Sequence, residues 1–292
     1  MAASPDLLVI VNPLSGTLSP EQKDLLIDFL VLQAKEVGYL PEVIITKYPG
    51  HATELATDAI QRGIRRIIAI GGDGTVNETA QALRHTATAL GIVPIGSGNG
   101  LARHLGIPLV PKEAILKALN GRPVVIDSGE VETHPFFCTA GFGFEAVVAH
   151  QFALQPVRGL TTYARTAYQQ FWQYKPEPLL VNGQEKTLFS LTFANAAQFG
   201  NNAWIAPKAN IADGLLDQCE LQSFPLQALV VLSWQLFNRT LDQSVYYRSE
   251  PVRTATIQGK NPLLLHADGE PITLLSDTCQ VRILPGSLLV LL

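Results

Sequence analysis

The chain has 292 residues, which is long enough for two domains of ordinary size and for a large hydrophobic core. Its 21 Lys and Arg residues against 25 Asp and Glu residues give a formal net charge of −4, and only 16% of the residues are charged. The chain therefore lacks the strongly positive electrostatic potential that attracts a nucleic-acid backbone, and we expect no nucleic-acid partner.

Three widely separated cysteines, Cys138, Cys219 and Cys279, form no CxxC pair, and their odd number argues against a complete disulfide framework. We expect buried, reduced thiols and a cytoplasmic protein. The apolar run Leu7–Val11 has no basic flank and no cleavage pattern, so it indicates a strand and not a signal peptide. No apolar stretch approaches the roughly 20 residues of a membrane helix, so membrane association would be peripheral and transient.

The first 127 residues alternate between short β-branched runs and helical patterns, which is typical of a parallel sheet covered by helices. The first expected helix begins at Ser19-Pro20, where Gln22 completes a capping box, and ends near Gly38. Its expected apolar face is formed by Leu25, Leu26, Phe29, Leu30 and Val37. The expected strands are Leu7–Val11, Glu42–Thr46, Arg66–Ile70, Leu90–Ile95 and Val124–Asp127. The other expected helices are His51–Ile60, Val76–Leu83, Leu101–His104 and Lys112–Leu119.

The second half of the chain changes to short strands, which favours a mostly antiparallel β-sandwich or barrel. Its hairpin-type turn pairs are Asn182-Gly183, Asp213-Gly214 and Asp268-Gly269. Helical stretches within Phe144–Tyr174 and Pro225–Asn238 interrupt the strands. We predict an α/β domain over 1–127 and a β-rich domain over 128–292, with the last strand, 287–292, packed on the first domain.

Gly71-Gly72-Asp73-Gly74-Thr75 lies between a buried strand and a helix in this prediction. Consecutive glycines let backbone N–H groups approach an anion, and the helix N-terminus adds about half a positive charge. The alternative is a tight turn without a ligand, which would leave the Asp73 carboxylate at the sheet's carboxyl edge without a purpose. The motif therefore predicts a phosphate site.

Two more loops follow expected parallel strands. Asn12-Pro13-Leu14-Ser15-Gly16 follows the first strand, and Gly96-Ser97-Gly98-Asn99-Gly100 follows the fourth. Each loop alone is commonplace. Because the carboxyl ends of parallel strands lie at one edge of a sheet, the three loops together predict a nucleotide crevice.

With these loops the chain resembles the diacylglycerol kinase and sphingosine kinase catalytic superfamily, particularly its soluble bacterial lipid kinases. The shared motifs run from residue 12 to residue 270. They are Asn12-Pro13-Leu14-Ser15-Gly16, Thr46 with His51-Ala52, Gly71 to Glu78, Gly96-Ser97-Gly98-Asn99, Ala140-Gly141-Phe142-Gly143-Phe144, Asp213-Gly214-Leu215-Leu216-Asp217 and Asp268-Gly269-Glu270. The resemblance implies a phosphofructokinase-like α/β domain, a β-rich domain, and transfer of the γ-phosphoryl group of ATP to a hydroxyl of a diacylglycerol-like or sphingoid-like lipid at a membrane surface.

The same resemblance implies ATP and Mg²⁺ as cofactors. Carried over to matching positions, the nucleotide contacts would be Asn12, Ser15, Gly16, Thr46, Gly72, Asp73, Gly74, Thr75, Glu78 and Ser97. In many relatives a threonine stands at the position of Ser97, and both residues offer a hydroxyl.

Transfer to a hydroxyl also needs a proton acceptor. In the bacterial branch this role falls on the Asp268-Gly269-Glu270 turn, most often on Glu270, whereas the sphingosine kinase branch assigns it to Asp73. In an extended segment Asp268 and Glu270 would lie on one face. An ordinary hairpin turn is the alternative for this tripeptide.

Asp213 and Asp217 are two carboxylates in an Asp-Gly-x-x-Asp loop, and a hard cation takes oxygen ligands from such a turn. By resemblance, Asp213 with the main-chain oxygens of Asn210 and Leu215 would hold a structural Mg²⁺. A solvated turn without metal is the alternative. The six histidines show no paired ligand spacing, so we expect them to be at the surface or hydrogen-bonded inside.

Two other functions remain open. An NAD kinase or another small-molecule kinase would share the Gly-Gly-Asp-Gly-Thr loop, and a nucleotide-gated lipid-binding protein would share both domains without catalysis. The Asn-Pro-x-Ser-Gly loop and the Asp-Gly-Glu turn favour the lipid kinase. Apolar residues of the stretch 144–172, interleaved with Arg158 and Arg165, are core positions or border the lipid entry. The sequence leaves the oligomeric state, a homodimer included, open.

Overall fold

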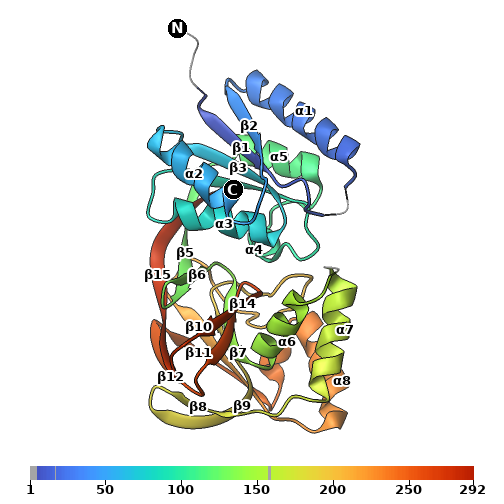
Figure 1. Ribbon diagram of the computed structural model, residues 1–292, viewed down its shortest axis with the longest axis vertical. Helices are drawn as coiled ribbons and strands as arrows, with labels where there is room; N and C mark the ends of the chain where they lie inside the picture. Colours follow the sequence, from blue (N-terminus) through green and yellow to red (C-terminus); the bar gives the residue numbers. More distant parts are fainter. Residues whose placement is uncertain (1–4, 17, 157–158) are drawn as a thin grey trace. The chain divides into compact units, whose positions relative to one another are not determined.

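The computed structural model describes residues 5–16, 18–156 and 159–292, which form two compact units (Figure 1). One unit comprises the residues up to 126 together with 286–292, and the other comprises residues 127–285. Strands β5 (Pro123–Val131) and β15 (Thr278–Leu291) each contribute residues to both units. The chain therefore passes between the units twice in extended conformation.

The first unit is built on a parallel sheet with the strand order β2–β1–β3–β4–β15. Its strands are β1 (Leu7–Val11), β2 (Pro41–Ile45), β3 (Arg66–Gly71) and β4 (Ala89–Pro94), and Leu289 and Val290 of β15 pair with Ala89 and Leu90. All five residues of β1 are buried, as expected for a parallel strand covered on both faces. The expected strands of the first 95 residues thus lie within two residues of the observed ones.

Helices cover this sheet: α1 (Pro20–Glu36), α2 (His51–Gln61), α3 (Asp73–Leu83), α4 (Gly100–His104) and α5 (Pro111–Asn120). The capping box predicted for α1 is present, because Ser19 Oγ accepts the Gln22 N–H and Gln22 Oε1 accepts the Ser19 N–H. The predicted apolar face of α1 is partly wrong. The buried positions are Lys23, Leu26, Leu30 and Ala34, whereas Leu25 is 66% and Val37 47% exposed. The buried positions are three or four residues apart and form one narrow face of the helix, so the apolar residues beside that face stay exposed.

The strand pairs of the second unit whose register is described are all antiparallel. Besides its parts of β5 and β15 it contains β6 (His134–Phe136), β7 (Thr139–Gly143), β8 (Pro178–Val181), β9 (Gln184–Ala194), β10 (Leu216–Gln222), β11 (Tyr247–Val252), β12 (Thr254–Gln258), β13 (Leu263–Ala267) and β14 (Glu270–Leu274). Side chains from these strands, Phe142 and Phe193 among them, form one buried core. The predicted fold class, a parallel α/β domain followed by a mostly antiparallel β-sandwich, is confirmed.

Two of the three predicted hairpin turns join paired strands directly: Asn182-Gly183 connects β8 to β9, and Asp268-Gly269 connects β13 to β14. The prediction for Asp213-Gly214 is wrong, because this pair lies in the long connection between β9 and β10 and precedes β10. An Asp-Gly pair favours left-handed backbone in any turn, whether or not strands flank it closely.

The described residues of the second unit form three α-helices: α6 (Phe144–Ala153), α7 (Leu160–Phe171) and α8 (Leu229–Phe237). Short 3₁₀ turns at Leu226–Ala228 and Leu241–Gln243 flank α8. Across the described part of the chain, no helix has the length and apolar character to cross a membrane. The three cysteines are all free and buried.

The Phe142–Phe193 pair offers a test of the sandwich core. Their rings meet edge to face with centroids 6.3 Å apart, and both side chains are fully buried. We expect Phe193→Leu to lower the unfolding free energy of the second unit by about 1 to 2 kcal/mol, since it removes the ring contact and leaves a small cavity. Urea titration followed by circular dichroism measures the change. The control Phe237→Leu, at a 53% exposed position, should shift stability by less than about 0.5 kcal/mol.

Candidate functional site

The loops that follow β1, β2 and β4 are held together at the carboxyl edge of the parallel sheet. The Asn12 N–H donates to the Ile70 carbonyl at 3.0 Å, the Thr46 N–H to the Val11 carbonyl at 2.8 Å, and the Ile95 N–H to the Gly71 carbonyl at 2.9 Å. Each of these bonds joins the first residue after one strand to the end of a neighbouring strand. The sheet itself therefore fixes where the loops begin.

Glycine lets these loops pack backbone against backbone. A Cβ on Gly96 would lie 2.6 Å from the Gly72 Cα, and a Cβ on Gly16 would lie 1.9 Å from the Ile95 oxygen. Gly16 also has a φ of +73°, which disfavours other residues. The Asn12 amide adds a side-chain link by donating to Thr75 Oγ1 at 2.9 Å. The three predicted loops thus lie in contact with one another within the first unit.

The Asp73 carboxylate clamps two of these loops. One of its oxygens accepts the Asn99 N–H at 2.8 Å and the other accepts the Gly100 N–H at 2.7 Å. A Cβ on Gly98 would lie 2.7 Å from the same carboxylate, so a larger residue here would have to displace it. Both oxygens of Asp73 are therefore engaged by main-chain donors at the start of α4.

The remaining predicted nucleotide residues fall into two groups. Gly74 and Ser97 are exposed at the loop edge, and Ser15 and Thr46 are half-buried beside it. Glu78, by contrast, lies inside α3, where its carboxylate accepts the N–H groups of Gly50 at 2.9 Å and Ala52 at 3.2 Å. Glu78 thus fixes the start of α2, a role that the sequence did not indicate.

Helix α3 supplies the electrostatic element of the loop cluster. Its N-cap is Gly72, which has no side chain to satisfy the first-turn N–H groups. The first N–H groups of a helix have no acceptor within the helix, and together they present about half a positive charge. The arrangement of bare backbone and open helix start suits an anion such as a phosphate.

In the second unit, Asp268 and Gly269 form the two-residue turn between β13 and β14, with φ values of 49° and 83°. The turn is not extended, so the condition under which Asp268 and Glu270 would share one face is not met. The Asp268 carboxylate instead accepts the N–H groups of Phe137 and Cys138 at 2.8 Å and of Thr139 at 3.0 Å. Burial raises the pKa of the Asp268 carboxyl above its ordinary value, against these three hydrogen bonds, which lower it.

Glu270 differs from Asp268 and Asp73. It is the first residue of β14, and its side chain is exposed. Within the described residues, no hydrogen bond or ion pair engages its carboxylate. Of the three carboxylates that the resemblance offers as proton acceptor, Glu270 is thus the one whose oxygens are not occupied by main-chain donors.

A buried polar cluster behind this turn was not predicted. Glu145 of α6 accepts the Thr192 hydroxyl at 2.5 Å, and its other oxygen lies 3.1 Å from His266 Nε2. On the opposite side of the imidazole ring, Nδ1 lies 3.2 Å from the Gly269 N–H and accepts it. With Nδ1 an acceptor, the ring proton resides on Nε2 and is donated to Glu145. The pair joins residues 121 positions apart, and no local spacing indicates it.

The predicted magnesium ligands lie in the connection that precedes β10. Asp213 Oδ1 accepts the Leu215 N–H at 3.0 Å, and Asn210 Oδ1 accepts the Ala212 N–H at 3.2 Å. An unpredicted residue, Asp127, holds the same turn by accepting the Gly214 N–H at 2.7 Å. Across the residues that the structure describes, no group of three or more His, Cys, Asp and Glu side chains is placed to hold a metal.

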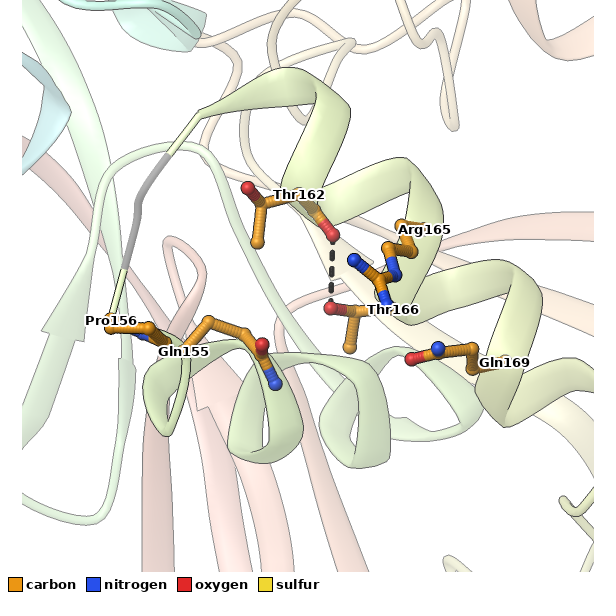
Figure 2. A pocket seen from close by; sticks show the side chains of 6 residues that line it. All are labelled: Gln155, Pro156, Thr162, Arg165, Thr166 and Gln169. Atoms are coloured by element: carbon orange, nitrogen blue, oxygen red, sulfur yellow. Dashed lines mark hydrogen bonds between the residues drawn. The ribbon is translucent and has the colours of Figure 1, made fainter.

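A cavity of about 220 Å³ lies where α6 and α7 adjoin (Figure 2). Its lining is polar and consists of Gln155, Pro156, Thr162, Arg165, Thr166 and Gln169. Figure 2 shows the Thr166 hydroxyl donating to the main-chain oxygen of Thr162, and this bond is 2.9 Å long. Arg165 is the one charged residue in this lining, and Arg158, which the sequence grouped with it, lies outside the described residues.

Comparison with known proteins matches both halves of the chain to described domain families. Residues 6–131 match the diacylglycerol kinase catalytic domain, and residues 138–292 match the YegS C-terminal NAD kinase beta sandwich-like domain. A crystal structure of a putative diacylglycerol kinase from Bacillus anthracis str. Sterne has the same fold, with a TM-score of 0.78 over 98% of this chain and 96% of that one at 21% identity.

Curated relatives extend the match over nearly the whole length. A protein of Chromohalobacter salexigens named probable lipid kinase YegS-like is 31% identical over 97% of this chain and 92% of the relative. A probable lipid kinase YegS of Salmonella arizonae is 26% identical over 99% and 96%. The resemblance drawn from the motifs is confirmed, and the chain belongs to the YegS-like family, in which a diacylglycerol kinase catalytic domain precedes a YegS C-terminal β-sandwich-like domain.

Proposed function

We propose that the chain is an ATP-dependent lipid kinase, which transfers the γ-phosphoryl group to a hydroxyl of a diacylglycerol-like or sphingoid-like lipid at a membrane surface. The observation that carries the proposal is the contact between the glycine loops beside the open start of α3. The names of the curated relatives, probable lipid kinases, support the choice of acceptor.

The loop cluster fits the phosphates of ATP. Backbone N–H groups of Gly72 to Thr75 at the start of α3 and the hydroxyls of Ser15 and Ser97 offer hydrogen-bond donors around a surface without bulky side chains. Asn12 and Gly16 support this surface through the contacts already described. Thr46, after β2, lies at the same sheet edge, where the nucleoside would bind.

The ligands proposed for a structural Mg²⁺ are the Asp213 carboxylate and the main-chain oxygens of Asn210 and Leu215. All three are oxygens, which suits a hard cation, and the single carboxylate leaves the remaining coordination positions to water. Two hydrogen bonds fix the shape of the turn. The Leu215 N–H donates to Asp213, and the Ala212 N–H donates to Asn210. A Mg²⁺ that arrives with ATP would neutralise the phosphate charge during transfer.

Glu270 is our choice for the proton acceptor. A general base must be able to reach the hydroxyl, and the Glu270 carboxylate is exposed, whereas main-chain donors hold the carboxylates of Asp73 and Asp268 in place. In the proposed step the lipid hydroxyl gives its proton to the Glu270 carboxylate, and its oxygen forms a bond to the γ-phosphorus. The bond from the γ-phosphorus to the bridging oxygen breaks, and ADP leaves with that electron pair.

The choice of base is tested by Glu270→Gln. We expect kcat to fall about 100- to 10,000-fold with the KM for ATP little changed, because the amide cannot accept the proton. Stability should be unaffected, since the side chain is exposed. The measurement is transfer of labelled phosphate from ATP to lipid in mixed micelles. Glu185→Gln, the same substitution at another exposed position of the second unit, should retain wild-type activity.

The acceptor class is tested by incubating the protein with labelled ATP, Mg²⁺ and a total lipid extract and identifying the product by mass spectrometry. A phosphorylated diacylglycerol, monoacylglycerol or sphingoid base is the expected product. Phosphorylation of NAD or another soluble compound without detergent would instead establish a small-molecule kinase. If nothing is phosphorylated while ATP and lipid both bind, the chain is a lipid-binding protein and the proposal is wrong.

His266 is expected to act as a positioning residue for the turn that precedes Glu270, through its bond from the Gly269 N–H. In His266→Asn the amide oxygen takes the place of Nδ1 and keeps this bond. In His266→Gln the amide reaches the Nε2 position, which keeps the Glu145 bond and loses the other. We expect kcat to stay near wild type in the Asn variant and to fall roughly 2- to 10-fold in the Gln variant. If kcat falls equally in both variants, and in proportion to their loss of stability, His266 has a purely structural role.

The structural metal site is tested by melting curves with and without Mg²⁺, in the absence of nucleotide. A bound ion stabilises the folded chain, so the wild-type Tm should rise with Mg²⁺ concentration. Asp213→Asn keeps an oxygen for the Leu215 N–H and loses the charge, so its Tm should not respond. Asp277→Asn, in the turn before β15, is the control and should respond as wild type. A wild-type Tm that is insensitive to Mg²⁺ would rule out the site.

A further inference from the structure

Helix α8 is apolar around nearly its whole circumference. Seven of its nine residues are apolar, yet only Leu232 is buried. Val230 is 76% exposed, Val231 55%, Trp234 60% and Phe237 53%. An amphipathic surface helix turns a polar face outward, and a helix that is apolar all round is normally covered by something. The exposed side of α8 is therefore a candidate interaction surface.

Helix α7 extends this surface. Tyr168 and Trp172, one helical turn apart, are 64% and 57% exposed, and their rings lie 6.0 Å apart. The neighbouring Phe171 ring stacks on the ring of Phe224, with the two centroids 6.1 Å apart. Because Phe224 lies shortly before α8, this contact joins α7 to the segment that leads into α8. Figure 1 draws α7 and α8 on the same side of the second unit. The α7–α8 face is defined here as Tyr168, Trp172, Val230, Val231, Trp234 and Phe237.

The two stretches of chain that carry this face contain no acidic residue, and Asp242, in the 3₁₀ turn that contacts α8, is paired with Lys208 at 2.8 Å. No Asp or Glu occurs between Glu145 and Glu177, nor between Glu220 and Asp242, although the chain has 25 of them and a net charge of −4. The charged residues that these two stretches contribute to the described structure are cations, Arg165 among them. These acid-free, weakly cationic stretches complement an anionic surface, which would repel carboxylates within about 10 Å.

The aromatic content fits a lipid surface. Two of the chain's three tryptophans, Trp172 and Trp234, belong to the α7–α8 face, whereas the third, Trp204, is buried. Tryptophan and tyrosine are enriched where apolar lipid chains meet polar headgroups, because their rings have an apolar body and a polar edge. Valine and phenylalanine side chains add apolar area that is stabilised when it leaves water.

We propose that the α7–α8 face docks on the surface of an anionic lipid bilayer, with the axis of α8 parallel to the membrane plane. The proposal rests on the proposed function, because a kinase of water-insoluble lipids must meet its acceptor at such a surface. A second copy of the chain is a poorer occupant. In a two-fold dimer the α7–α8 faces of both copies would meet. Cations such as Arg165 would then approach one another without acidic partners.

The test is flotation of the purified full chain with vesicles, without ATP. Vesicles of equal parts phosphatidylglycerol and phosphatidylcholine should carry the wild type, and phosphatidylcholine alone should carry less. The variant Val230→Ser/Trp234→Ser should partition about tenfold less, since it removes two exposed apolar side chains from the contact. The control Leu109→Ser/Leu275→Ser changes two exposed apolar residues outside the face and should float as wild type.

Kinetics separate this inference from the proposed function. For the docking variant, the apparent KM for lipid presented in vesicles should rise about tenfold, with turnover of a short-chain lipid dissolved below its micelle concentration unchanged. A wild type that phosphorylates lipid but does not float, or a docking variant that floats as wild type, overturns the docking surface alone. A protein that floats as expected but phosphorylates no lipid overturns the function and leaves the surface standing. A wild-type dimer that the docking variant converts to a monomer would show that a second copy covers the face.

Discussion

The close approach of Gly72 to Gly96 is the constraint on which the architecture of the first unit's loops depends. With a Cβ on Gly96 only 2.6 Å from the Gly72 Cα, no other residue fits without moving one loop away from the other. The separation of these loops sets the position of the α3 start, whose first N–H groups have no acceptor within the helix. Asp73 then secures the arrangement with two charge-assisted hydrogen bonds to the start of α4. Close backbone contacts, fixed by the Asp73 side chain, thus shape the proposed phosphate site.

Asp73 and Asp268 show that an acidic residue inside a motif can be an anchor. Each stands next to glycine, and each uses its carboxylate to accept main-chain N–H groups from a second loop. Such bonds stabilise the ionised carboxylate and hold it in place. Glu270 differs, because its side chain is exposed and no hydrogen bond within the described residues engages its carboxylate. In our proposal the tripeptide Asp268-Gly269-Glu270 therefore combines a positioning residue, Asp268, with a proton acceptor, Glu270.

In the first unit, the alternation of β-branched runs and helical patterns was sufficient to predict the order of the strands and helices. The spacing of apolar residues within each segment indicates which of the two it forms. The glycine loops were predicted to meet because parallel strands end at one edge. Contacts between distant side chains carried no such local signal. The Glu145–His266 pair spans 121 positions, and the bonds by which Glu78 holds the start of α2 also had no local signal. The turn at Asp213-Gly214 shows a third limit, since turn chemistry predicts the local backbone but not the length of the connection between two strands.

Helix α8 departs from the match between apolar residues and burial that strands such as β1 and β3 show. Valine, tryptophan and phenylalanine side chains that remain in contact with water do not stabilise the folded state, and they promote aggregation. Other exposed apolar side chains, Leu14 and Leu275 among them, are spread over loops, α1 and β5. The α7–α8 face falls within two stretches without Asp or Glu, which separates the acidic residues in sequence from this apolar surface. This separation is what a protein of net charge −4 needs if one side is to approach an anionic surface while the rest keeps it soluble.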